Sequence, residues 1–154
     1  MRSVLPILLA FLVACSPQDS QPVFENGSFR IQGLKGITVE PGVAQFRSVK
    51  AEYILVKYSD VEMSLQAIDI DSYGHLLLFN HLDFVSKIDI GEFSEMFRSE
   101  PDHHGDASVC FVGRVEGRTA SATVYGKSTD ELLSRDYEAL LTAIHIKPSK
   151  PNGE

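Results

Sequence analysis

The residues whose side chains most clearly could do chemistry form the short polar run 102–106. Imidazole and carboxylate groups are ligands for zinc, copper and nickel. The four candidate ligands are Asp102, His103, His104 and Asp106. Adjacent side chains in a loop rarely reach one ion together, so His75, His81 or a distant acid would have to converge on the same point. The alternatives to a divalent-metal site are a solvated connecting loop and a pH-sensitive histidine contact.

The first residues have the layout of an export signal. Arg2 precedes an apolar run over residues 4–14, and a cation followed by such a run is typical of a secretory signal. A helix that spans hydrocarbon needs roughly 20 apolar residues. Because this run is only about half that length, we do not expect a permanent transmembrane anchor.

The run ends in Leu12-Val13-Ala14-Cys15. This segment resembles the lipobox of bacterial lipoproteins, in which small residues precede an invariant cysteine. The resemblance implies that residues 1–14 are removed and that Cys15 carries a diacylglyceryl group, with an acyl chain such as palmitate on its new α-amine. Several chains together give firm anchoring, whereas one chain gives marginal binding. The alternatives are an ordinary cleaved signal peptide with an incidental cysteine, and a cytosolic protein with an apolar start.

The residue after the cysteine bears on the location. In lipoproteins, an aspartate at this position resembles a signal for retention in the inner membrane. Here the residue is Ser16, which does not resemble that signal. For a Gram-negative host, the resemblance therefore implies a protein of the outer membrane that faces the periplasm. The polar segment that follows predicts a tether over residues 15–23, a single domain over residues 24–147 and a flexible tail over residues 148–154.

The composition favours a globular acidic domain. The 154 residues are 44% hydrophobic and carry a net charge of −7. Removal of Arg2 with the signal leaves 13 basic and 21 acidic residues, a net charge of −8. Nucleic-acid binders present basic patches, and we expect no nucleic-acid partner. An acidic surface gains nothing from anionic headgroups, so we expect the lipid on Cys15 to hold the chain at the membrane.

If Cys15 is lipidated, Cys110 has no partner for an internal disulfide. It lies in the apolar run 107–112, which predicts a strand with little water on either face. A buried free cysteine behaves as a small hydrophobe. The alternative, a nucleophile or metal ligand, would need a nearby base or cation.

The remaining pattern predicts an α+β fold. Alternation predicts strands over residues 28–32, 53–58, 61–67, 107–115 and 119–125, with a bulge at Ala67-Ile68. Pro41-Gly42 is expected to end the short segment that begins at Ile37, and residues 71–79 are expected to form a hairpin. Spacing of apolar residues predicts a short amphipathic helix over 92–98. The expected architecture is an antiparallel sheet built from hairpins, with helices packed on it.

The clearest expected element is a C-terminal amphipathic helix. Ser128-Thr129-Asp130-Glu131 matches a capping box. The apolar residues that follow at helical spacing are Leu133, Tyr137, Leu140, Leu141 and Ile144. The order of a hairpin and then a capped helix resembles the end of PsbP-like domains, which implies an antiparallel sheet between helices.

The sequence contains no Gly-x-Ser-x-Gly elbow, no phosphate-cradling glycine loop and no His-Glu-x-x-His helix. We therefore expect a non-enzymatic envelope lipoprotein that binds another envelope or secreted protein. Small, acidic, lipid-anchored chains of this composition resemble immunity lipoproteins, which neutralise a toxin; an accessory subunit of an envelope complex is a related hypothesis. The alternative function is binding of a metal ion or small solute around His103 and His104.

Overall fold

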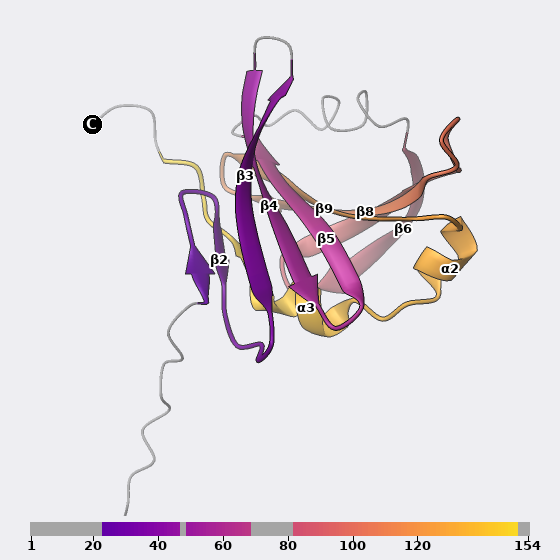
Figure 1. Ribbon diagram of the computed structural model, residues 1–154. Helices are drawn as coiled ribbons and strands as arrows, with labels where there is room; N and C mark the ends of the chain where they lie inside the picture. The colour runs from indigo at the N-terminus through magenta and orange to yellow at the C-terminus, as the bar shows by residue number, and fades with distance from the viewer. Residues whose placement is uncertain (1–22, 47–48, 69–81, 151–154) are drawn as a thin grey trace, which may run out of the picture.

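The computed structural model describes residues 23–46, 49–68 and 82–150. These residues form two antiparallel sheets and two short helices (Figure 1). In order across the large sheet, its strands are β3 (Thr38–Phe46), β4 (Val49–Tyr58), β5 (Val61–Ile68), β9 (Arg118–Gly126), β8 (Ala107–Val115), β7 (Phe93–Ser99) and β6 (Asp83–Ile90). The small sheet consists of β1 (Phe24–Glu25), β2 (Phe29–Ile31) and β10 (Ile144–Ile146). The helices are α2 (Thr129–Leu133) and α3 (Glu138–Ala143).

Two consecutive runs of strands build the large sheet. Strands β3 to β5 form one run and β6 to β9 form the other, and pairing of β5 with β9 joins them. The hairpin expected at residues 107–125 is confirmed as β8 and β9. The expected alternation is also confirmed in β5, where Val61, Met63 and Leu65 are buried.

One face of the large sheet carries the main hydrophobic core. Side chains from β5, β8 and β9 meet those of β2, β10, α2 and α3 in this core. In Figure 1 the sheet curves, α3 lies across one end of its strands and β2 lies at one side. Small side chains at Ala107, Ala120 and Ala122, all fully buried, leave room for the apolar residues of α2 and α3. We call the opposite face of the large sheet its outer face.

The helix expected over residues 92–98 is wrong, because this segment is strand β7. The register of β7 against β8 shifts between Phe93 and Glu95. The shift places Phe93 in the main core and Phe97 in a second cluster on the outer face. A bulge adds one residue to a strand, so Phe93 and Met96, which are three residues apart, both face the core, and this i, i+3 spacing imitated a helix.

The long C-terminal helix is also wrong, because the structure has α2, α3 and β10 in its place. Ser128 caps α2 as expected, since its Oγ accepts a hydrogen bond from the Glu131 backbone N–H. The Glu131 carboxylate does not complete the box and pairs with Arg135 at 2.6 Å. Asp136 then accepts the Glu138 N–H at 2.9 Å. Short polar side chains that bond nearby backbone groups in this way compete with helix continuation.

Two smaller expectations also fail. Pro41-Gly42 does not end a strand, because β3 runs through both residues to Phe46. Proline is tolerated there because β3 is an edge strand, and the ring of Tyr53 lies against Gly42. The bulge expected at Ala67-Ile68 is absent, since the pairing of β5 with β9 is continuous through both positions. The expected hairpin over residues 71–79 lies outside the described residues.

Candidate functional site

The polar run that suggested metal chemistry is a compact loop between β7 and β8. Asp102 Oδ1 accepts hydrogen bonds from the backbone N–H groups of His104 at 2.8 Å and Asp106 at 3.1 Å. The Gly105 N–H donates to the Asp102 carbonyl at 2.8 Å, and Gly105 has a φ of 76°, which glycine adopts without strain. The hydrogen bonds from Asp106 and His104 hold the pKa of Asp102 below its usual value. Asp102 therefore organises the loop.

The other candidate ligands of this loop make separate contacts. His103 and His104 are exposed, and their ring centroids lie 3.9 Å apart at a tilt of 46°. Asp106 forms an ion pair with Lys127. Within residues 23–46, 49–68 and 82–150, no three His, Cys, Asp or Glu side chains gather as a metal-binding group. His75 and His81, the proposed supporting ligands, lie outside the described residues.

Cys110 is buried, as its sequence context predicts, with 1% of its surface exposed. It lies on the outer face of β8, where Phe97, Val112 and Leu82 surround it. Burial raises the pKa of the Cys110 thiol to about 11. Because the thiolate is the reactive species, this environment suppresses reaction at neutral pH.

Two aromatic side chains on the same outer face are exposed. The strand register places Phe84, Phe97, Cys110 and Thr123 in one row across β6, β7, β8 and β9. Tyr125 lies two residues beyond Thr123, so it shares this face. Phe84 is 55% exposed and Tyr125 is 60% exposed. Partly exposed aromatic residues are the type that protein interfaces favour.

A buried arginine that sequence reasoning missed joins the two sheets. Arg118 is 6% exposed and donates from one guanidinium nitrogen to the carbonyls of Gly27 at 2.7 Å and Lys147 at 2.8 Å. It begins β9 directly after the tight turn at Gly117, where the sequence suggests an exposed cation. No local pattern indicates that a turn 91 residues away supplies its acceptor.

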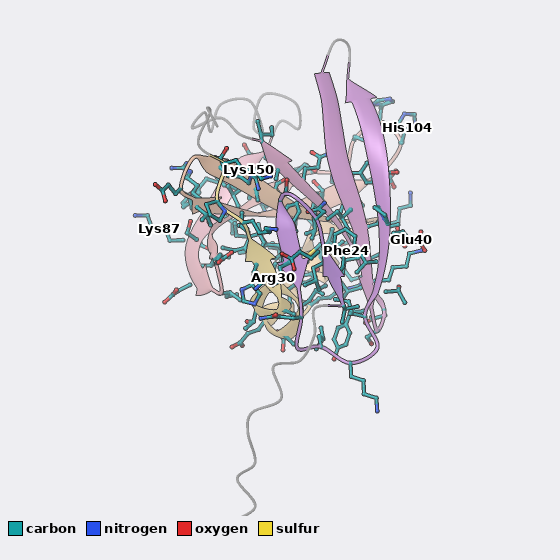
Figure 2. All side chains as sticks on the ribbon, turned by 90° about the vertical axis from the view of Figure 1, so that its left-hand side faces the viewer. Phe24, Arg30, Glu40, Lys87, His104 and Lys150 are labelled. Carbon is teal, nitrogen blue, oxygen red and sulfur yellow. The ribbon has the colours of Figure 1, made fainter. Side chains whose placement is uncertain are left out.

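The outward side of the small sheet carries a row of charged and titratable groups. Glu25, Arg30 and His145 are paired in register across β1, β2 and β10. Glu25 forms ion pairs with Arg30 at 3.2 Å and with Lys147 at 2.9 Å. The hydrogen bond from Lys147, followed by that from Arg30, lowers the pKa of Glu25. Figure 2 looks onto this side of the molecule, with Arg30 and Phe24 labelled.

The expected lipidation site, Cys15, lies outside the described residues. The first described residue, Val23, lies eight residues after Cys15, and its backbone N–H donates to the Ile31 carbonyl at 2.8 Å. None of the helices in the described part of the chain is long and apolar enough to cross a membrane. Comparison with protein-family models, with curated proteins and with solved structures finds no match for this chain.

Proposed function

We propose that this protein is a lipid-anchored component of the bacterial envelope, at the periplasmic side of the outer membrane, and that it acts by binding another protein. The observation that carries the proposal is the segment Leu12-Val13-Ala14-Cys15 placed eight residues before the first described residue. Acyl chains on Cys15 would hold the domain within about 28 Å of the bilayer, because an extended chain spans at most ~3.5 Å per residue. A domain held at that distance meets envelope and secreted proteins directly.

Two features of the domain support a protein partner. The exposed aromatics Phe84 and Tyr125 offer apolar area next to the buried cluster around Cys110. The strongly negative charge of the domain favours encounter with a basic protein through long-range attraction. A toxin-neutralising immunity lipoprotein and an accessory subunit of an envelope complex both fit this description.

The binding of a metal ion or small solute remains the second candidate. The observation in its favour is the close, exposed pair His103 and His104. The carboxylates beside them are already occupied, Asp102 by backbone N–H groups and Asp106 by Lys127. Protein binding is therefore the function that the arrangement supports better.

Anchoring is tested with Cys15→Ser. The variant should lose acylation and accumulate as unprocessed precursor, because the thiol is the acceptor of the diacylglyceryl group. Mass spectrometry and membrane fractionation measure both effects. A variant that still fractionates with membranes at the mature size would remove the lipoprotein proposal.

Partner binding is tested by affinity capture of the lipidated protein from its own envelope. The double variant Phe84→Ser with Tyr125→Ser should lose the partner that the native protein retains. Val23→Ser is the matched control, since Val23 is also an exposed hydrophobic residue, 53% exposed, directly before β1. Equal capture by the native chain and the double variant would exclude this face as the binding surface.

A further inference from the structure

The charge of this protein is divided unevenly between its two sheets. We define the small-sheet unit as residues 23–37 and 144–150, which contain β1, β2, β10 and their flanking turns. This unit has four Lys or Arg residues and one Glu, a net charge of +3 with neutral histidine. Residues 38–143 have nine Lys or Arg and 18 Asp or Glu, a net charge of −9. An acidic protein thus carries a basic end.

Contacts with the large sheet leave this end basic. Arg118 lies beneath the Gly27 turn and adds one positive charge. Glu92 accepts the Ile146 N–H, and the Glu116 carbonyl accepts the Ser149 N–H at 3.0 Å, so these two acids add two negative charges. The unit together with these neighbours still has a net charge of +2.

The outward side of the small sheet is free of other described elements. In β2, Phe29 and Ile31 face the core at 1% and 0% exposure, and Arg30 between them is exposed. His145 alternates in the same way between the buried residues Ile144 and Ile146. Glu25 lies between Arg30 and Lys147 and offsets one of them. In Figure 2, Arg30 lies on the side that faces the viewer.

The tether enters the domain at this basic end. Val23 pairs with Ile31 at the margin of the small sheet, and the loop that follows carries Lys35. The eight residues back to Cys15 restrict this end to at most about 28 Å from the bilayer. Attraction between charges acts within about 8–10 Å at physiological salt. The tether therefore allows the domain to come within the roughly 8–10 Å over which charges attract. Because the tether joins the domain at the basic end, this end is the part that can approach the bilayer most closely.

We infer that the outward side of the small sheet is a membrane-apposed face that contacts the phosphates of anionic phospholipids. This inference rests on the proposed lipid anchor and adds an orientation to it. The lipid anchors the chain, and the basic end turns the small sheet toward the bilayer. Repulsion between anionic lipid and residues 38–143 favours the same orientation, so the acidic large sheet projects away from the membrane, toward its partner.

The test measures how fast an amine-reactive reagent acylates individual lysine side chains in the full lipidated chain. The chain is bound to vesicles of phosphatidylcholine alone or of phosphatidylcholine with equimolar phosphatidylglycerol. Each Lys or Arg at an anionic surface strengthens association about fivefold, which corresponds to about 1 kcal/mol. We expect acylation of Lys147 to slow by about fivefold or more on the anionic vesicles and to recover in high salt. Lys87, on the edge strand β6, is the matched control and should react equally on both.

Charge variants separate headgroup contact from the effect of the tether. Arg30→Glu should abolish the slowing at Lys147, whereas Lys87→Glu should leave it unchanged. Equal rates at Lys147 on both vesicles would overturn the inference, and so would equal slowing at Lys87. Failure of the anchor itself is distinguished separately, because a chain without acyl groups shows no lipid mass and does not remain with either vesicle.

Discussion

The hairpin of β8 and β9 and the loop that leads into it are adjacent in sequence and opposite in physical character. In the hairpin, side chains are buried on both faces: Val109 and Phe111 in the main core, Cys110 and Val112 in the second cluster. In loop 101–106 the histidines are exposed and the hydrogen bonds are local. A substitution in the hairpin therefore acts on the stability of the whole domain, whereas a substitution in the loop acts on little beyond the loop. Function is better sought where stability does not constrain the residue.

The largest expected contrast is in the reactivity of Cys110. With 1% exposure and a pKa of about 11, the thiol should react with a maleimide only when the domain unfolds. For a domain with about 5 kcal/mol of stability, labelling should be at least about a thousandfold slower than in denatured protein. Mass spectrometry of timed samples measures the rate. Fast labelling of folded protein would show that the outer face of β8 opens.

The same thiol predicts a pH dependence. Its pKa is raised from 9.0 to about 11 in the folded protein, so the unfolded state loses the proton first as pH rises. The contribution of the Cys110 thiol to the free energy of unfolding is fully present below pH 9 and is lost between about pH 9 and 11. Melting of the native protein should therefore fall more steeply over this interval than melting of Cys110→Ala.

The next contrast concerns the residues that cover the hairpin from the core side. Leu140 in α3 is 2% exposed and lies in the same core cluster as Val109 and Phe111. Leu140→Ala should lower the free energy of unfolding by about 2–5 kcal/mol, because it leaves a cavity. Denaturant unfolding measures the change. Ala139→Ser, at an exposed neighbouring position, is the control, and equal stability of the two variants would show that α3 does not form part of the core.

A smaller difference is expected between the two arginines of the hairpin. Arg118→Met should cost about 1–3 kcal/mol, since the carbonyls of Gly27 and Lys147 lose the buried charged donor that joins them. Arg114→Met removes an exposed ion pair with Glu95 at 3.8 Å and should cost about 1 kcal/mol or less. Thermal melting of the two variants, measured side by side, tests the difference. If they melt alike, Arg118 does not tie the small sheet to the large one.

The success of sequence reasoning follows the same division between regular and irregular structure. Regular alternation predicted β5, β8 and β9, because each strand keeps one register over its length. The bulge in β7 disguised a strand as a helix, and local hydrogen bonds of Asp136 and Glu131 divided the expected C-terminal helix. Strand β10 depends on pairing with β2, more than 100 residues away, which no local pattern contains.

The candidate sites show the same limit. Burial of Cys110 was predictable because it follows from a local apolar run. The role of Arg118 was not, since its acceptors come from both ends of the chain. The charge division between the sheets was hidden in the same way, because the small-sheet unit joins residues 23–37 with residues 144–150. Only folding makes those two basic segments one surface.

The smallest expected effect on stability is in loop 101–106. The double variant His103→Ala with His104→Ala removes two exposed rings and leaves the hydrogen bonds of Asp102 intact. The free energy of unfolding should change by no more than about 0.5 kcal/mol. Asp102→Ala is the contrasting variant, because it removes an acceptor that two backbone N–H groups share, and it should destabilise the loop more than the double variant does.

The double histidine variant, compared with the native protein, also decides between a connector and a metal site. A ligand that binds only the folded state raises its melting temperature, and the stabilisation grows as the logarithm of the ligand concentration relative to the dissociation constant. If zinc or copper raises the melting temperature of the native protein and not that of the double histidine variant, the loop binds metal and the second candidate function gains its site. If metal changes neither protein, the loop is a connector. The exposed aromatics Phe84 and Tyr125 then remain the surface on which a partner should be mapped, since they combine exposure with a position on the outer face of the large sheet.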